Sequence, residues 1–384
     1  MGRAELLQGC AQKRSSLTGL STLHIGICFL YSRVKLTKGV KSLRKIAFII
    51  LSLLLLIPAT GVYSKGSAPE EKISLVFAGD ILLDGFVGDQ ITRYGVNFPF
   101  AKVAPVLKKA DLSFANLETP VSVRGKAAEK TFAFRSRPET LGGLGYAGID
   151  GVTLANNHIL DYGQQAMLDT LIHLDRNKIG HTGAGSNIEE AFKPYVKTVK
   201  GKRIAVLGAS RVLSGPSWHA GKNTPGAASA YTAEPLLGAI KKSAKENDFT
   251  VVYLHWNEEF KDYPQEYART LAKQMIDSGA DIILGAHSHC LMGIEYYKHK
   301  PIYYSLGNFV FNKSTRGGEK TVHSMLAHFE ISGSAVTGRI TPVKIIGGQP
   351  NFMNEAYNKE AIKKLNGLSF NAKIAADGKV SEKQ

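Results

Sequence analysis

The segment Asp281-Ile-Ile-Leu-Gly-Ala-His-Ser-His289 places two histidines directly after a short apolar run. The run Ile282–Ala286 has the length and the apolar content of a buried β-strand. His287 and His289 follow it at positions i and i+2, where both imidazoles can turn into one crevice once the chain has left the sheet. Taken alone, the segment also fits two solvent-exposed loop histidines, so other parts of the chain are needed to distinguish the two interpretations.

The same arrangement of an apolar run followed by a polar side chain recurs from Ile73 onward. Helical patterns lie between several of these runs, at Tyr162–Lys178 and Tyr267–Ser278, and Gly279 is a typical helix stop. Alternation of strands and helices predicts an α/β architecture, in which ligands bind beyond the carboxyl ends of the strands. The six further runs of strand length are Ile73–Ala78, Asp111–Ala115, Val152–Ala155, Ile204–Ala209, Thr250–Leu254 and Ile302–Leu306.

Six of the seven runs end close to a carboxylate, an imidazole or a side-chain amide. Exposed strand ends carry Gly, Ser or Lys as readily, so this recurrence indicates a shared site. Individually, simpler interpretations exist: a turn residue for Asp80, a rim carboxylate for Glu118 and a core histidine for His255. The candidate residues at the strand ends are Asp80, Asn116 with Glu118, Asn156–His158, His255, His287 with His289, and Asn308.

The chemistry of this set favours metal ions. Imidazole suits zinc or iron, and carboxylates add harder cations such as manganese. A mixed oxygen and nitrogen set, spread over many strand ends, suits two adjacent divalent ions of the Mn, Fe or Zn type. Two such ions can bind an attacking hydroxide and stabilise the charge on a phosphoryl group. The residues therefore favour a binuclear hydrolytic site.

The segment Asn156-Asn-His-Ile-Leu-Asp161 carries a candidate acid. Asn157 can offer an amide oxygen to a metal, His158 can donate a proton to a leaving group, and Asp161 can hold the His158 ring. A helix N-cap formed by an asparagine is the simpler interpretation of the same segment.

The N-terminal part has the pattern of a membrane-targeting segment. Residues 1–65 hold ten Lys/Arg and one acid, so they carry +9 of the net charge of +16. The basic flank Lys41–Lys45 precedes the uncharged apolar run Ile46–Ile57, which favours a signal anchor or signal peptide and places the following domain outside the cytoplasm. A buried helix of a soluble domain is the alternative. We expect a single-pass protein of the cell membrane, or a secreted protein if the segment is cleaved.

The predicted organisation has five parts. The parts are a basic leader at 1–45, a transmembrane signal anchor or signal peptide at 46–64, a linker at 65–72, a domain at 73–370 and a flexible tail at 371–384. Within the domain, we expect the Gly- and Pro-rich stretch Leu213–Ala233 to be a surface loop covering the site. We expect Glu355–Asn366 to be a short helix.

Cysteine content and charge further limit the possible functions. Of the three cysteines, only Cys290 lies in the predicted domain, which therefore has no internal disulfide. Cys290 is expected to be a buried thiol, with a metal ligand or a nucleophile as the alternatives. The charge of +7 outside residues 1–65 suits a phosphoester or an anionic polymer. Nucleic acid is disfavoured because the chain has no dense Lys/Arg tract with interleaved aromatics.

A set of motifs between Ile73 and Ser369 gives a family resemblance. In order and context they resemble the CapA family of poly-γ-glutamate capsule biosynthesis proteins. That family is similar to the calcineurin-like metallophosphoesterases, which implies an α/β/β/α sandwich of two facing mixed sheets. The motifs are Phe77-Ala-Gly-Asp80, Asp111-Leu-Ser-Phe-Ala-Asn-Leu-Glu-Thr-Pro120, Leu154-Ala-Asn-Asn-His-Ile-Leu-Asp-Tyr-Gly163, His255-Trp256 with Glu259, Gly285-Ala-His-Ser-His289 with Gly293-Ile-Glu295, and Tyr304-Ser-Leu-Gly-Asn-Phe309.

The resemblance implies a role for each matching position. Asp80 would be a terminal metal ligand and Glu118 the carboxylate that bridges two ions. Asn157 would be a further ligand and His158 the general acid. The three imidazoles that would complete the two metal shells belong to His255, His287 and His289.

Two positions depart from the family patterns. Metallophosphoesterases usually have a histidine two residues after the first aspartate, and Leu82 stands there, which leaves one metal shell a ligand short. Asn257 stands where CapA-like proteins usually have glycine after His-Trp, so a β-carbon enters the loop that carries His255. Both departures make the case for catalysis weaker than the case for the fold.

Three functions follow from these observations. The first is a metal-dependent phosphoesterase outside the membrane, and the second is a non-catalytic subunit that binds an anionic polymer within a polyglutamate synthase or export complex. The third is a cell-surface scaffold with a relict site. The first two are compatible, and the resemblance implies membrane partners belonging to a polyglutamate synthase.

Overall fold

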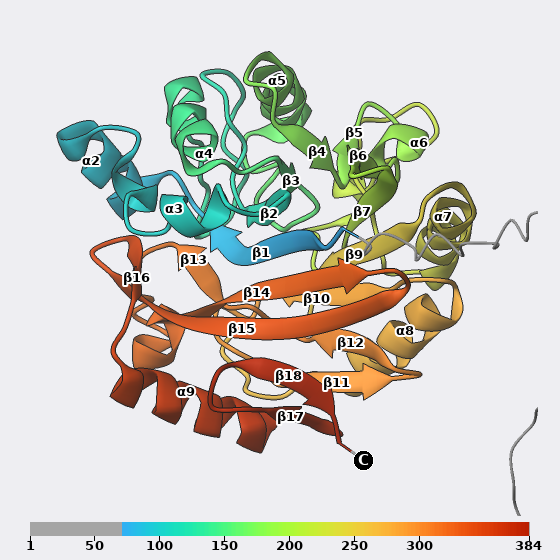
Figure 1. Ribbon diagram of the computed structural model, residues 1–384. Coiled ribbons are helices and arrows are strands. Elements are labelled where there is room, and N and C mark those ends of the chain that lie inside the picture. Colours follow the sequence, from blue (N-terminus) through green and yellow to red (C-terminus); the bar gives the residue numbers. More distant parts are fainter. Residues whose placement is uncertain (1–70, 384) are drawn as a thin grey trace, which may run out of the picture. The chain divides into compact units, whose positions relative to one another are not determined.

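The computed structural model describes residues 71–383 of the chain (Figure 1). The predicted leader and anchor, together with most of the linker, lie outside the described residues. Among residues 71–383, no helix combines the length and the apolar character needed to cross a membrane.

The first sheet contains ten strands and is mixed. Its central strand, β1 (Ile73–Ile81), runs parallel to β2 and antiparallel to β14. Strand β13 (Asn308–Val310) pairs with the end of β1, and β16 (Gln349–Phe352) pairs with β15. The spatial order of the other strands is β17 (Ala372–Ile374), β18 (Lys379–Glu382), β15 (Ala335–Ile346), β14 (His323–Ser332), β1, β2 (Leu112–Leu117), β3 (Gly151–Thr153) and β4 (Gly180–Thr182).

The second sheet contains six strands and is also mixed. Its four inner strands are parallel, and an antiparallel strand closes each edge. The order is β11 (Ile294–Tyr297), β12 (Lys300–Tyr303), β10 (Ile282–Ala286), β9 (Phe249–His255), β7 (Lys202–Ser210) and β6 (Tyr195–Val199). A separate ribbon joins β5 (Ala184–Gly185) to β8 (Gly226–Ala227).

The helices are distributed between the strands along the chain. The α-helices are α2 (Gly85–Tyr94), α3 (Ala104–Leu107), α4 (Gly142–Ala147), α5 (Gly163–Arg176), α6 (Ile188–Ala191), α7 (Ala233–Glu246), α8 (Glu266–Asp277) and α9 (Glu355–Leu368). Single 3₁₀ turns occur at Phe98–Phe100, Pro138–Leu141, Pro216–Trp218 and Gly318–Val322.

Alternation of side chains along the strands builds three apolar clusters. Phe77 of β1 and Tyr253 of β9 belong to one cluster, so the two sheets face each other across it. Val76, which points to the opposite face of β1, packs in a cluster with residues of helices α2 to α5. Leu207 and Val252 of the second sheet pack with residues of α7 and α8. The described residues thus form helices, sheet, sheet and helices in succession, and the predicted α/β fold with mixed sheets is confirmed.

The predicted flexible tail is wrong. Residues 371–384 include the hairpin β17–β18, which pairs with β15 at the edge of the first sheet. The side chains of Ala372, Ile374 and Val380 are buried in the cluster between the sheets. The segment is ordered because these alternating apolar side chains gain more from burial than the hairpin loses in chain entropy.

Candidate metal centre

The polar residues at the strand ends meet where the two sheets face each other. Asp80 lies in register with Asn116 of β2 on one side and with Asn308 of β13 on the other, and both pairings are parallel. In the second sheet, β9 and β10 are parallel, and His255 lies in register with the last residue of β10. Parallel pairing carries the chemical groups to the same edge of each sheet, as the sequence pattern predicts.

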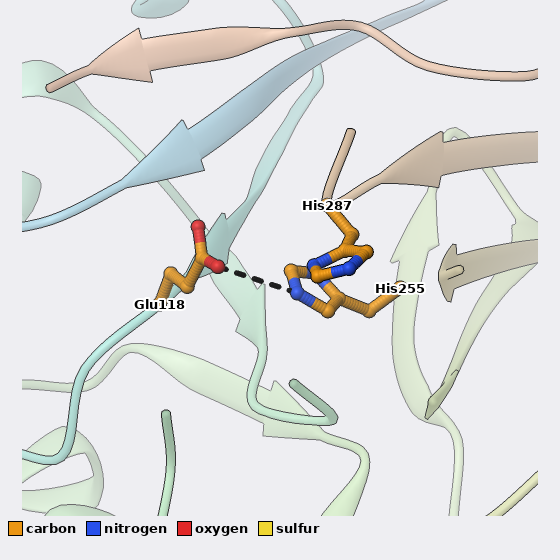
Figure 2. A group of neighbouring side chains, drawn as sticks. All are labelled: Glu118, His255 and His287. Atoms are coloured by element: carbon orange, nitrogen blue, oxygen red, sulfur yellow. Dashed lines mark ion pairs between the residues drawn. The ribbon is translucent and has the colours of Figure 1, made fainter. Parts of the chain in front are cut away.

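Glu118 occupies the middle of the cluster. It is fully buried, and neither carboxylate oxygen has a hydrogen-bond partner within residues 71–383. Its Oε1 lies 3.3 Å from Nε2 of His255 and 4.0 Å from Nε2 of His289 (Figure 2 shows the first pair). Nδ1 of His287, which is drawn beside His255, is also buried without a partner among the described residues. Such groups are costly unless a ligand satisfies them.

The donor atoms form two sets that share Glu118. One set joins Glu118, His255 and His287, and the other joins Asp80, Glu118 and His289. Within each set, the donor atoms lie within 4.8 Å of one another. Carboxylate oxygens and imidazole nitrogens brought together in this way fit divalent cations, and a shared carboxylate fits two neighbouring ions.

Asparagine side chains orient members of the two donor sets through hydrogen bonds. Asn116 donates through Nδ2 to Oδ1 of Asp80 at 2.8 Å, and the same nitrogen lies 3.2 Å from Nδ1 of His255. Asn156 in turn donates to Oδ1 of Asn116 at 3.0 Å. Oδ1 of Asn157 lies 2.8 Å from Nε2 of His255, so this amide oxygen reaches the edge of one donor set.

The loop after β10 turns two rings back into the site. His287 and His289 have φ angles of 88° and 54°, which side chains with a β-carbon rarely adopt. Backbone conformations of this kind persist only when surrounding contacts hold them. Oδ1 of Asn308 lies 2.8 Å from Nδ1 of His289, and Asp80 accepts a hydrogen bond of 3.3 Å from the His287 amide. The strained loop therefore places both imidazoles beside the carboxylates.

Asn257 also has a left-handed backbone, with φ at 72°. This conformation explains the glycine expected at its position, because glycine adopts it freely and asparagine tolerates it better than most residues. The Asn257 amide donates to the hydroxyl of Tyr267 at 2.7 Å, and its Oδ1 accepts from the Gln265 amide at 3.0 Å. The added β-carbon is thus accommodated while His255 stays in the cluster.

Burial and charge push the pKa values of the cluster apart. Burial and the nearby Glu118 carboxylate raise the pKa of Asp80 to about 6. Burial opposes ionisation of Glu118, but the His289 and His255 imidazoles hold its pKa below its usual range. Burial, followed by the charge of His255, lowers the pKa of His287 well below the ordinary value. A charged carboxylate beside a neutral imidazole is the combination that binds a metal ion.

His158 is held by groups outside the donor sets. Its Nδ1 lies 2.6 Å from Oδ2 of Asp161, which also accepts a hydrogen bond of 2.8 Å from the Phe134 amide. Because Asp161 occupies Nδ1, the Nε2 atom is the one left to face a substrate.

Lys130 is a site residue that the sequence did not reveal. Its Nζ donates to Oδ1 of Asp161 at 2.8 Å and to the carbonyl of Asn157 at 2.7 Å. The ring of Trp218, from the predicted covering loop, lies 5.2 Å from the same nitrogen. Lys130 belongs to an irregular segment with no periodic pattern, so only the folded chain shows that it links Asp161, the partner of His158, to the backbone of Asn157.

The structure thus brings the predicted site residues into one connected cluster, while their roles as ligands and acid stay predictions. Leu82 lies beside it as a buried apolar side chain, so the set around Asp80 has no imidazole from that position. Cys290 belongs to neither donor set; its Sγ donates to the carbonyl of Lys261 at 3.1 Å, and burial raises its pKa. These contacts favour the interpretation of Cys290 as a buried thiol. The cluster contains Asp80, Glu118, Asn157, His158, Asp161, His255, His287 and His289.

Fold and site together define a class of protein: a mixed α/β protein with two buried donor sets that share one carboxylate. The chain belongs to the family described as bacterial capsule synthesis protein PGA_cap, whose sequence model matches residues 74–313. The predicted relationship to the CapA family is therefore confirmed.

Known proteins give the extent of the likeness. The chain is 34% identical over 346 residues to the capsule biosynthesis protein CapA of Bacillus anthracis, covering 86% of this chain and 82% of that protein. It is 35% identical over 286 residues to the PGA biosynthesis protein CapA of Bacillus subtilis, covering 73% and 74%. A solved phosphatase of Mycoplasma pneumoniae is 15% identical, with a TM-score of 0.46 over 72% of this chain and 94% of that one.

Proposed function

We propose that this protein is a membrane-anchored, extracytoplasmic phosphoesterase that uses two divalent cations and acts in the synthesis or export of a poly-γ-glutamate capsule. The observation that supports hydrolysis is Glu118, a fully buried carboxylate with no hydrogen-bond partner among residues 71–383, shared by two donor sets. The names of its CapA relatives support the capsule process.

The residues present fit two cations of the Mn, Fe or Zn type. Glu118, His255 and His287, with Asn157 at their edge, would hold one ion, and Asp80, Glu118 and His289 would hold the other. When bound, such ions polarise phosphoryl oxygens and activate water for attack on phosphorus. Asn116 and Asn308 would keep Asp80 and His289 in place through the hydrogen bonds described above.

His158 would supply the proton for the leaving group. The Asp161 carboxylate fixes the ring through Nδ1, which leaves Nε2 as the atom that would give up a proton. Lys130 holds Asp161 from its other oxygen, which keeps the carboxylate in position. The alcohol product would leave after taking the Nε2 proton.

The membrane part of the proposal rests on the sequence of residues 41–64. A basic flank followed by an uncharged apolar run is typical of a signal anchor that leaves the following domain outside the cytoplasm. Cleavage of that segment would convert the anchored protein into a secreted one.

A non-catalytic subunit of a polyglutamate synthase or export complex is the second candidate. It is favoured by Leu82, because the donor set around Asp80 has three members and no imidazole from that position. In that case the ions and the basic surface would engage an anionic polymer, and phosphoesters would not be cleaved.

Elemental analysis and turnover of the full chain in detergent test the proposal. Wild type is expected to bind two ions per chain and to hydrolyse a chromogenic phosphomonoester or phosphodiester with added manganese. Glu118→Gln should lose most of the bound metal and most of the turnover, because an amide cannot bridge two cations. Glu330→Gln is the matched control, since Glu330 has a half-exposed side chain paired with Lys72 on the surface.

Two outcomes would contradict the proposal. Bound metal without turnover under any ion would favour the non-catalytic subunit. If the chain binds no metal and shows no turnover, the metal centre is ruled out and the scaffold is favoured.

A further inference from the structure

A cavity of about 270 Å³ opens beside the metal centre, and most of its wall is apolar. We call it the phenylalanine pocket, because its lining includes Phe86, Phe132, Phe134, Phe260 and Phe311. These side chains come from four separate segments of the chain. Phe86 and Phe132 are 41% and 51% exposed, so two large apolar rings face solvent at its rim. An exposed apolar concavity of this kind is typical of a ligand site.

The inner wall of the phenylalanine pocket belongs to the metal centre. His158 and His289 line the same cavity. The Phe134 ring lies 4.8 Å from the His158 ring, and the Phe311 ring lies 5.1 Å from the His289 ring. If His158 protonates the leaving oxygen as proposed, the pocket would lie on the leaving-group side of a bound phosphoryl group.

The charges around the phenylalanine pocket do not favour a polyanion there. Lys313 pairs with Glu319 at 2.9 Å, and Arg316 pairs with Glu259 at 3.0 Å. Asp84 accepts a hydrogen bond of 2.8 Å from the Arg135 amide. Each lysine or arginine that lines the cavity therefore already has an acid partner, although Glu319 is shared between Lys313 and Lys344. A glutamate chain bound here would lose the water around its carboxylates to phenyl rings, and no unpaired cation would compensate for that loss.

We propose that the phosphoester substrate carries an apolar group about the size of one aromatic ring on its leaving oxygen, and that the phenylalanine pocket binds this group. A cavity of about 150 Å³ holds benzene, so the volume here accommodates one ring with its linkage to phosphate. This inference rests on the proposed function for the hydrolytic step.

The corresponding reaction balances as a simple hydrolysis. A bond forms between phosphorus and the oxygen of water, and the bond between phosphorus and the leaving oxygen breaks. The leaving oxygen takes a proton from Nε2 of His158, the attacking water loses a proton to solvent, and solvent returns a proton to His158. From a phosphomonoester, the products are phosphate and an apolar alcohol, which leaves the phenylalanine pocket.

Binding of two phosphonates tests the pocket without requiring turnover. Benzylphosphonate and methylphosphonate differ by one phenyl ring, and neither is a phosphoester. Calorimetry on the metal-loaded full chain should show benzylphosphonate binding about tenfold more tightly, because the ring leaves water for an apolar wall. Phe132→Ser should reduce that ratio toward one while leaving methylphosphonate affinity unchanged.

Phe352→Ser is the matched control. Phe352 is 39% exposed and lies in β16, outside the pocket lining, so its loss should leave the ratio unchanged. Equal affinities, no measurable binding of benzylphosphonate, or a ratio insensitive to Phe132→Ser would each overturn the inference.

A turnover assay separates this inference from the proposed function. The phosphate monoesters of benzyl alcohol and of 2-methoxyethanol have leaving alcohols of similar acidity, so a preference for the benzyl ester reports the pocket. If neither ester is hydrolysed but benzylphosphonate still binds more tightly than methylphosphonate, the phosphoesterase function is contradicted and the pocket is retained as a binding site. If both esters are hydrolysed equally and Phe132→Ser has no effect, the role of the pocket is contradicted while the phosphoesterase function is retained.

Discussion

Glu118 carries two buried oxygens that no described part of the chain satisfies. A carboxylate in that position is costly unless positive charge stands beside it. The neighbouring imidazoles lower its pKa and keep it charged. At the residue scale, this buried carboxylate is what supports the proposal that Glu118 belongs to a site for two cations.

His158 gives the sharpest residue-scale prediction for catalysis. His158→Asn should reduce kcat by about 10²- to 10⁴-fold, because a positioned acid contributes that much to proton transfer. Bound metal, measured by elemental analysis, should stay at the wild-type level, since His158 belongs to neither donor set. His181→Asn is the control, because His181 pairs with Asp175 near the surface. A variant with normal kcat would remove His158 from the mechanism.

Elements explain how the residues come together. Strand β1 pairs in parallel with β2 and β13, and β9 pairs in parallel with β10, so each sheet presents its carboxyl ends to the site. The last hairpin, β17–β18, lies far along the chain but completes the edge of the first sheet.

The hairpin leads to a stability prediction. Ile374→Ala should lower the free energy of unfolding by about 2–5 kcal/mol, because it opens a cavity in the core between the sheets. Lys373→Ala, at the exposed neighbouring position, should change it by less than about 0.5 kcal/mol. Chemical denaturation followed by circular dichroism measures both. A flexible tail would leave the two variants equal to wild type.

Strand β14 carries a half-buried histidine, His328, that couples stability to pH. Burial, followed by the charge of Arg339, lowers the pKa of His328 from 6.5 to about 4. The unfolded chain therefore binds a proton that the folded chain refuses between those values, and stability falls as pH drops through this window. The loss is up to about 3 kcal/mol from this residue.

Comparison of two variants measures that coupling. His328→Gln should flatten the fall in the free energy of unfolding between pH 6.5 and about 4. His299→Gln should leave it unchanged, because the His299 side chain is 91% exposed. Parallel curves for wild type and His328→Gln would contradict the assignment.

At the scale of the whole molecule, we propose that a membrane segment precedes a catalytic domain outside the cytoplasm. In cells that make the polymer, Asp80→Ala should abolish poly-γ-glutamate while the protein stays in the membrane fraction. Protease added to intact protoplasts should digest the domain at residues 71–383. Polymer that persists in Asp80→Ala but disappears on deletion of the whole chain would favour the scaffold. A protected domain would contradict the topology.

Much of the site could be predicted from the sequence. The strand-end rule led to Asp80, Glu118, His255 and the pair His287 and His289, because a strand and the polar residue after it are adjacent in the chain. The family resemblance separately implied their roles. Asn257 could be recognised as a departure, but only its φ of 72° shows why glycine is expected there.

The rest depended on contacts between distant segments. Lys130, the ordered hairpin around Ile374 and the phenylalanine pocket have no local sequence pattern, because each is created by segments that meet only when the sheets pack. The sequence by itself determined the chemical groups and the strands that carry them, since both are local properties. Only the tertiary structure decided that Glu118 is shared by two donor sets and that an apolar pocket adjoins them, because these arise from packing across the two sheets.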